Sequence, residues 1–268
     1  MQVTNLLRYW NRLADIPKAR TVVRNWWSLT KAYAAGDHPS RTFLAEFSTG
    51  DRISLHGWHE IAALWHIYVR ECYRVMPTDL YIVDAGANIG LFATWAARRA
   101  PKAKLICVEP HPKTCSRLRA LVGELNLTDR VTVVESALGG DSEPRWIEDA
   151  AAGDSTESHV STGKSAKGFS VACTTLSELL KRERWTTVDL LKIDIEGSEY
   201  ETLLAETDDS LRRIKRINVE FHVPDEGAAR KKAELLDRLQ RAGFRITRRN
   251  EDRSGYGVFF FEGRLLSS

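Results

Sequence analysis

The chain has 268 residues, of which 43% are hydrophobic, and a formal net charge of +3. This length suits one ordinary domain with an extension, and the near balance of charge gives no argument for a nucleic-acid partner. The cysteines lack a C-x-x-C pair, which excludes a disulfide framework and a cysteine zinc site; they are Cys72, Cys107, Cys115 and Cys173. No apolar run approaches the roughly 18 residues of a transmembrane helix, and the first residues lack a signal-peptide pattern, so we expect a cytoplasmic protein.

Residues 1–75 are predicted to form a helical extension, because apolar residues recur there at helical spacing. The spacing is clearest in two groups, which are Leu6, Leu7, Trp10 and Leu13, and then Val22, Val23, Trp26 and Trp27. Residues 1–31 carry six basic side chains and only one acidic one. A basic, tryptophan-bearing helix can lie on a membrane surface, so membrane contact by residues 1–31 stays open. We favour the alternative that the tryptophan faces pack inward as a cap on the rest of the chain.

Two further elements are predicted before residue 80. Residues 43–55, from Phe43 to Leu55, are expected to form a small hairpin, and Glu60 to Val75 a helix that ends at Pro77.

Residues 80–98 predict a cradle for a nucleotide-type cofactor. Leu80 to Val83 is a short apolar run typical of a buried strand, and Ile89 to Arg98 has the spacing of an amphipathic helix. Gly86 and Gly90 frame the turn between them. Glycine lets a ligand approach the backbone, and the free N–H groups of the first helical turn face it.

The spacing of this turn distinguishes between cofactors. The dinucleotide fingerprint needs G-x-G-x-x-G, but Asn88 stands where the glycine that admits the pyrophosphate belongs. Asp84 would also place a carboxylate beside two phosphate charges. S-adenosylmethionine, which carries an ammonium and a sulfonium but no phosphate, fits better. A nicotinamide oxidoreductase is therefore less favoured, while a non-catalytic module that binds a nucleoside cofactor remains an alternative.

Glu109 supports the prediction of a cofactor site. It ends the apolar run from Lys104 to Val108, 19 residues after Gly90, and Pro110 follows it. An acidic residue about 20 positions further on, at the tip of the second strand, is where ribose hydroxyls are held.

From residue 80 onward, strands alternate with helices, which predicts an α/β domain with a parallel sheet covered on both faces. Ser136 and Ala137, at the end of the predicted strand Val131–Glu135, either approach an adenine edge or form a plain turn. The segment 139–168 is expected to be an irregular loop, and its part from Gly140 to Gly168 to fold over an acceptor. The other predicted elements are the helices Pro112–Leu125, Thr175–Arg182 and Ala228–Ala242, the strand Phe169–Cys173 and a closing hairpin of Phe244–Arg249 and Gly257–Phe261.

A second group of chemical residues follows the predicted strands Val188–Ile193 and Arg216–His222. Asp194, Glu196 and Glu199 crowd the end of the first, where open α/β sheets bind ligands, and Glu220 and His222 lie at the end of the second. Lys192 shares a face with Asp194 and is expected either in a structural ion pair or in the site. Asp194, Glu220 and His222 are the candidate catalytic residues. They would either remove the acceptor proton without a metal, with His222 as base, or hold a divalent ion; we favour the metal-free reaction.

Five blocks together resemble the FkbM family of methyltransferases. They are VDAGANIGLFA at 83–93, VEP at 108–110, TLSELL at 175–180, LLKIDIEGSEYETL at 190–203 and VEFH at 219–222, in the order of the family. The resemblance implies that residues 76–268 form a seven-stranded, S-adenosylmethionine-dependent methyltransferase domain. It implies transfer to an oxygen of a sugar, glycan or small metabolite. We expect no nucleic-acid partner, because the charge of the chain is nearly balanced.

The resemblance also implies roles for residues of these blocks. Asp84, Gly86, Asn88 and Gly90, with Ala87 among them, would line the methionine end of the cofactor, and Glu109 with Pro110 the ribose. Ser136 and Ala137 would lie near the adenine, and Asp194 close to the reacting methyl group.

Overall fold

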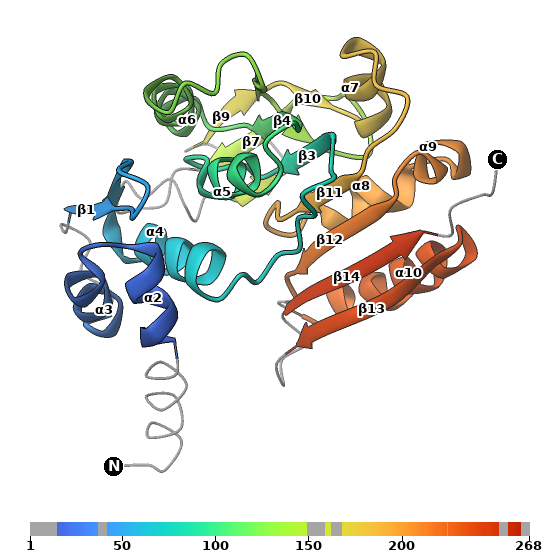
Figure 1. Cartoon of the computed structure of the whole chain (residues 1–268). Helices are drawn as coiled ribbons and strands as arrows, with labels where there is room; N and C mark the ends of the chain where they lie inside the picture. Colours follow the sequence, from blue (N-terminus) through green and yellow to red (C-terminus); the bar gives the residue numbers. More distant parts are fainter. Residues whose placement is uncertain are drawn as a thin grey trace. The chain divides into compact units, whose positions relative to one another are not determined.

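The computed structural model describes residues 15–36, 42–148, 159–161, 168–223, 225–251 and 257–263 (Figure 1). The chain divides into two compact units, residues 1–72 and 73–268. Each unit is described by itself below.

The first unit combines helices with a two-stranded hairpin. Its described elements are α2 (Ile16–Val22), α3 (Trp26–Ala34), β1 (Thr42–Glu46), β2 (Arg52–His56), α4 (Gly57–Leu64) and the π-helix η1 (Trp65–Val69). Strands β1 and β2 pair antiparallel with Phe43 opposite Leu55, which confirms the predicted hairpin. Both side chains are buried, and burial alternates along the two strands. The two-residue alternation of apolar side chains in the sequence therefore predicts these strands correctly.

Two predicted helices of this unit have different limits. The pattern from Val22 to Trp27 predicted one helix, but Val23 is extended and bridges to Phe47, so the helix breaks there. Val23 is fully buried and β-branched, which favours that conformation. The helix predicted over 60–75 begins at Gly57 and ends at Val69, because the chain widens into η1 and Glu71 then adopts a left-handed φ of 50°.

An aromatic stack holds the first unit together. The Tyr33 ring stacks on Trp65 at 4.8 Å and on Trp58 at 6.0 Å between centroids. The Trp65 Nε1–H donates to the Asp15 carboxylate, whereas Trp27 is 53% exposed. The predicted helix over Leu6–Leu13 lies outside the described residues. No helix in the described part of the chain is long and apolar enough to cross a membrane.

The second unit is built on a seven-stranded sheet with the order β13-β14-β12-β11-β3-β4-β5. Its strands are β3 (Tyr81–Ala85), β4 (Lys104–Glu109), β5 (Val131–Glu135), β11 (Leu190–Ile193), β12 (Arg216–Phe221), β13 (Phe244–Glu251) and β14 (Gly257–Gly263). The first five pair in parallel, and β14 pairs antiparallel with both β12 and β13. This arrangement confirms the predicted sheet and its closing hairpin.

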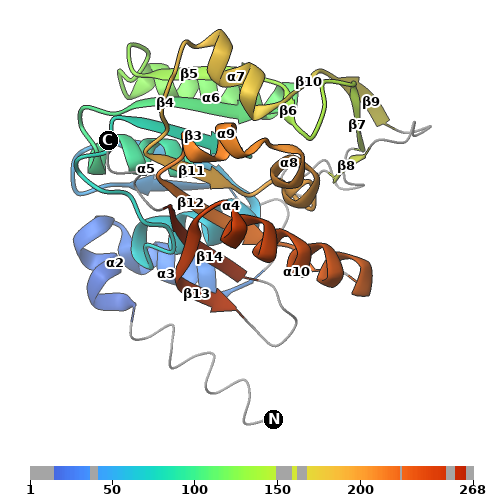
Figure 2. The same ribbon diagram turned by 90° about the vertical axis from the view of Figure 1, so that its right-hand side faces the viewer.

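Helices cover this sheet. They are α5 (Leu91–Arg99), α6 (Pro112–Glu124), α7 (Leu176–Arg182), α8 (Glu199–Ala205), α9 (Asp208–Arg212) and α10 (Glu226–Arg241). Helices α8, α9 and α10 lie on one face (Figure 2), where leucines of α7, α8, α9 and α10 form one core with apolar residues of β3, β11 and β12. The other face of the central strands meets α5, whose residues from Leu91 to Ala97 are all buried.

The segment predicted as an irregular loop over 139–168 contains strands, so that prediction is wrong for its described part. Strand β7 (Arg145–Glu148) pairs antiparallel with β8 (His159–Ser161) and β9 (Gly168–Val171). Nearby, β6 (Ala137–Leu138) pairs in parallel with β10 (Cys173–Thr174), so the strand predicted over 169–173 is two short ones. Ile147 is fully buried against Ala137, Val171 and Cys173, which anchors β7 to the domain. Most of the loop predicted to close over the acceptor lies outside the described residues.

Candidate active site

The glycine turn, residues 85–90, connects β3 to α5 and requires its glycines. Gly86 has a φ of +74°, and a Cβ at this position would lie 1.7 Å from the backbone oxygen of Asp194. Gly90 has a φ of +94°, and a Cβ there would lie 2.5 Å from Leu118 Cδ1. Only glycine adopts these conformations without strain in such little space. The turn is therefore pressed against the loop after β11 and against α6.

Glu109 fixes the turn from the end of β4. Its Oε2 accepts the backbone N–H of Asn88 at 2.9 Å, and its Oε1 accepts that of His111 at 2.9 Å. Burial raises the pKa of Glu109, and the two backbone hydrogen bonds partly offset that rise. Because a carboxylate has about four acceptor positions, two remain for a ligand.

A cavity opens beside the turn at the carboxyl ends of the parallel strands. It is lined by Gly86, Asn88, Val108, Glu109, Pro110, His111, Ala137, Leu138, Ile147, Asp194, Ile195, Glu196 and Ser198. It encloses ≈ 100 Å³, less than the roughly 300–1,000 Å³ typical of ligand pockets, so a cofactor bound there also extends over the open rim. The predicted residues Gly86, Asn88, Glu109, Pro110, Ala137 and Asp194 thus share one cavity wall.

Four predicted cofactor residues do not line the cavity: Asp84, Ala87, Gly90 and Ser136. The N–H of Ala87 donates to the Val108 oxygen, and the Ser136 hydroxyl donates to backbone oxygens of Ala137 and Ala172. Both side chains are buried, and neither lines the cavity. Their predicted contacts with the cofactor therefore find no support in this geometry.

Asp84 is also buried completely, and its partner is Lys192. The Lys192 Nζ lies 3.1 Å from Asp84 Oδ1 and donates to the Gly86 oxygen at 2.8 Å. Burial raises the pKa of Asp84 against the opposing charge of Lys192. Burial alone would lower the pKa of Lys192, but Asp84 and Asp194 outweigh it and raise that pKa. Asp84 thus acts on the turn through Lys192, and the structural ion pair considered for Lys192 is present.

Asp194 connects this ion pair to the neighbouring strand. Its Oδ2 lies 3.5 Å from Lys192 Nζ, and the Tyr73 hydroxyl lies 3.3 Å from the same oxygen. The Tyr73 hydroxyl donates to Glu220 Oε2 at 2.6 Å, which is the shorter and stronger contact. Tyr73 is buried and packs edge-on against Phe92. A residue outside all the predicted site motifs thus bridges two candidate catalytic carboxylates.

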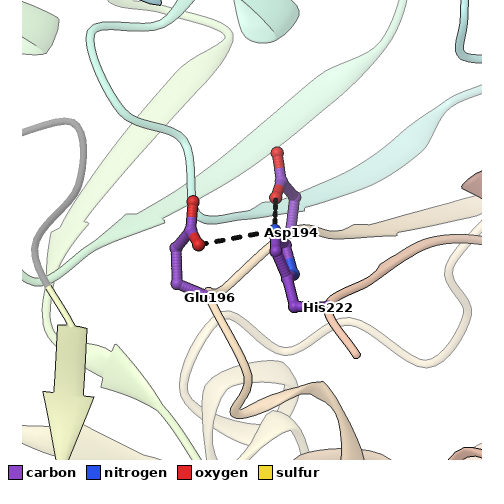
Figure 3. Close-up of side chains that lie close together, drawn as sticks. All are labelled: Asp194, Glu196 and His222. Carbon is purple, nitrogen blue, oxygen red and sulfur yellow. Dashed lines mark ion pairs between the residues drawn. The ribbon is translucent and has the colours of Figure 1, made fainter. Parts of the chain in front are cut away.

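His222 lies among three carboxylates at the end of β12. Its Nδ1 forms a short hydrogen bond with Glu199 Oε1, and Glu199 is fully buried at the start of α8. Its Nε2 lies 3.4 Å from Glu196 Oε2 and 3.9 Å from Asp194 Oδ1 (Figure 3). The predicted trio was Asp194, Glu220 and His222; the structure instead gathers Asp194, Glu196 and His222, while Glu220 contacts Tyr73. We call Asp194, Glu196, Glu199, Glu220 and His222 the acidic cluster.

The crowding of charge shifts the protonation of this cluster. Burial alone would lower the pKa of His222, but the hydrogen bond and charge of Glu199, with Glu196 and Asp194, raise it to about 9. Burial raises the pKa of Glu196 to about 7, with the charges of Asp194 and Glu199 adding to the rise and His222 opposing it. The imidazole is therefore protonated at neutral pH unless another cation takes its place.

A larger groove lies at the opposite ends of the parallel strands. It measures ≈ 1170 Å³ and runs between α10 and β13–β14, with Lys215 and Arg216 at the start of β12 in its wall. Ligands of open α/β sheets bind at the carboxyl ends of the strands. The cavity beside the glycine turn is therefore the candidate active site despite its smaller size.

The sheet order, the glycine turn and the cavity at the strand ends define a class I methyltransferase. The sequence model described as Methyltransferase FkbM domain matches residues 84–246, which is more than half of the chain. The chain therefore belongs to the FkbM family of S-adenosylmethionine-dependent methyltransferases, and the sequence resemblance is confirmed.

The chain is also similar to curated proteins, and a solved structure shares its fold. The chain is 28% identical over 237 residues to Methyltransferase sdnD of Sordaria araneosa, covering 76% of this chain and 90% of that protein. It is 27% identical over 226 residues to AMB antimetabolite synthetase AmbE of Pseudomonas aeruginosa, covering 69% of this chain but only 10% of that much longer protein. The crystal structure of Methyltransferase FkbM from Methylobacillus flagellatus matches with a TM-score of 0.50 at 12% identity, covering 97% of this chain and 60% of that one.

Proposed function

We propose that this chain transfers a methyl group from S-adenosylmethionine to a hydroxyl oxygen of a sugar, glycan or small metabolite. The observation that carries the proposal is the position of the acidic cluster: Asp194 and Glu196 line the same cavity as the glycine turn and Glu109. A binding module without catalysis has no need for proton-accepting groups at that place.

The residues of the cavity fit the cofactor that the family implies. Gly86 leaves the turn free of a side chain, and Glu109 keeps acceptor positions for ribose hydroxyls. When bound, S-adenosylmethionine supplies a methyl group on a sulfonium sulfur, which keeps the electron pair of the broken S–C bond as the acceptor oxygen forms the new C–O bond.

The chain has two tasks in such a transfer. The cavity wall holds the acceptor oxygen in line with the methyl group, and alignment of this kind contributes roughly 7–11 kcal/mol to catalysis. The acidic cluster receives the hydroxyl proton, which an alcohol has to lose during the reaction. Asp194, Glu220 and His222 remain the proposed catalytic residues, with Asp194 in the cavity wall itself and His222 acting as a base only after it has lost its own proton.

Calorimetric titration of the whole chain tests the cofactor. S-adenosylmethionine and its demethylated product should bind, and NADH should not. Glu109→Ala should weaken binding at least tenfold, because a hydrogen bond to a charged group contributes roughly 1.5–3 kcal/mol. Glu135→Ala is the matched control, since Glu135 pairs with Glu109 in register on the next strand but is partly exposed and bonded to Arg119. Binding of NADH alone would overturn the proposal.

The acceptor is tested with the titrated protein. Panels of sugars, glycans and small alcohols are incubated with S-adenosylmethionine, and mass spectrometry detects a product that gains one methyl group. A product methylated on nitrogen or carbon, with no oxygen acceptor in the same panels, would contradict transfer to oxygen.

A further inference from the structure

Against the metal-free reaction favoured from the sequence, we propose that Asp194, Glu196 and His222 bind one divalent metal ion at the wall of the cavity, with Glu196 in the place considered for Glu220. Their ligand atoms all lie within 4.8 Å of one another. The His222 Nε2 is 3.4 Å from Glu196 Oε2 and 3.9 Å from Asp194 Oδ1. Ligands about 2.1 Å from one metal ion at tetrahedral or octahedral angles lie about 3.0–3.4 Å from each other. Figure 3 shows the three side chains close together, with dashed lines from His222 to Asp194 and to Glu196. Side-chain rotations that shorten these separations would place the three atoms around one ion.

In Asp194 and in His222, the second polar atom of the side chain has contacts of its own. Asp194 Oδ2 faces Tyr73 and Lys192, which leaves Oδ1 on the side of His222. The His222 Nδ1 is held by Glu199, which leaves Nε2 toward Asp194 and Glu196. The three atoms that converge are thus Asp194 Oδ1, Glu196 Oε2 and His222 Nε2.

Glu199 supplies an observation independent of the three ligands. Its carboxylate is fully buried behind the imidazole, and its Oε2 accepts no hydrogen bond within the described residues. Imidazoles that bind metals commonly have a carboxylate at the other ring nitrogen, which fixes the ring and its tautomer. A buried carboxylate with an unbonded oxygen also indicates negative charge that the surrounding side chains leave uncompensated.

The balance of charge favours a cation of more than one charge. Three carboxyl groups, those of Asp194, Glu196 and Glu199, lie around the single imidazole of His222. Lys192 is shared between Asp84 and Asp194. A divalent ion would offset the excess that remains, whereas a bound anion would add to it.

The ligand types indicate the class of ion. Mn²⁺, Fe²⁺ and Zn²⁺ are bound better by one imidazole with two carboxylates than by oxygen ligands alone. For its role, the inference rests on the proposed function: open positions on the ion would receive the acceptor hydroxyl and lower its pKa, so that a weak base removes the proton. Binding of the ion itself requires neither the cofactor nor the acceptor.

Titration with Mn²⁺ alone tests the inference on the whole chain after treatment with EDTA. Electron paramagnetic resonance of free Mn²⁺ and calorimetry should both report one saturable site. His222→Ala and Glu196→Gln should each weaken it at least tenfold, and Glu199→Gln by about 10- to 100-fold as the supporting carboxylate. Glu135→Gln removes the same charge at a distant strand end and should leave Mn²⁺ affinity unchanged.

Two outcomes would overturn the inference. One is the absence of saturable binding in the unmodified chain, which would make His222 a protonated partner of the carboxylates. The other is binding that persists in both His222→Ala and Glu196→Gln. Circular dichroism and thermal unfolding of each variant show that it is folded. Titration of the unmodified chain with S-adenosylmethionine separates the two proposals: Mn²⁺ binding without cofactor binding refutes only the proposed function, and cofactor binding without Mn²⁺ binding refutes only the metal site.

Discussion

The glycine turn and the acidic cluster border one cavity but are stabilised in different ways. The turn is held by side chains that bond to its backbone groups: Glu109 accepts the N–H of Asn88, and Lys192 donates to the Gly86 oxygen. The acidic cluster is held by side chains from separate elements and contains more negative than positive charge. A wall fixed through its backbone suits a cofactor with many atoms to hold, and a cluster rich in carboxylates suits a cation or a departing proton. Four predictions test this difference.

The largest effect on cofactor binding is expected from a substitution at Gly86, where the turn has no space for a side chain. Gly86→Ala places a methyl group 1.7 Å from the backbone oxygen of Asp194 and imposes a φ that alanine rarely adopts. We expect the variant to lose detectable binding of S-adenosylmethionine in calorimetry. Gly123→Ala is the control, because a Cβ there meets nothing within 4 Å on α6, and it should bind as the unmodified chain does. Full binding by Gly86→Ala would show that the turn is more deformable than this packing implies.

Because of the acidic cluster, the stability of the metal-free chain should depend on pH. The pKa of His222 is about 9 in the folded state against 6.5 as its ordinary value. Because folding raises the pKa of this base, the contribution of His222 to the free energy of unfolding is complete below pH 6.5 and is lost as the pH rises through 9. The contribution is at most roughly 3 kcal/mol. Thermal unfolding in EDTA should therefore show a melting temperature that falls between pH 6.5 and 9.5.

His222→Gln is the control for this pH dependence and should flatten the curve over that range. The raised pKa of Glu196 acts in the same direction at lower pH, because a carboxyl group that is harder to ionise when folded costs stability as the pH rises through 7. A flat curve for the unmodified chain would mean that the carboxylates around His222 are not charged as described.

The same difference explains which parts the sequence predicts. The glycine turn is contiguous, and its spacing alone indicates a cradle; the alternation of strands and helices likewise predicts the sheet. The contacts of the acidic cluster join residues far apart, such as Tyr73 and Glu220, or His222 and Glu199. Neither Tyr73 nor the role of Glu199 has a motif, because each depends on how strands are placed side by side. The short strands β7 and β8 also give too few residues for a period of two to show.

An intermediate effect on cofactor affinity is expected from Glu109, where a substitution can change one carboxylate oxygen alone. Glu109→Gln keeps the shape of the side chain but replaces one acceptor oxygen by an NH₂ group, which meets a backbone N–H donor of Asn88 or His111. Cofactor affinity should fall about 10- to 150-fold, corresponding to roughly 1.5–3 kcal/mol. Calorimetry measures it, with Glu135→Gln as the matched variant. An unchanged affinity would mean that the carboxylate supports neither the turn nor the ribose.

The smallest effect is expected from Tyr73. Its hydroxyl lies between two carboxylates, that of Asp194 in the cavity wall and that of Glu220 on β12. Tyr73→Phe removes the hydroxyl that donates to Glu220 at 2.6 Å, without changing the contact of the ring with Phe92. Stability should fall by about 1 kcal/mol, which lowers the melting temperature by roughly 2–4 °C for a domain of this size, while cofactor affinity stays the same. Tyr81→Phe is the control, because the Tyr81 ring packs on Trp185 and its hydroxyl is not part of the cluster. If Tyr73→Phe weakened cofactor binding instead, the acidic cluster and the glycine turn would be one coupled unit rather than two separately stabilised walls.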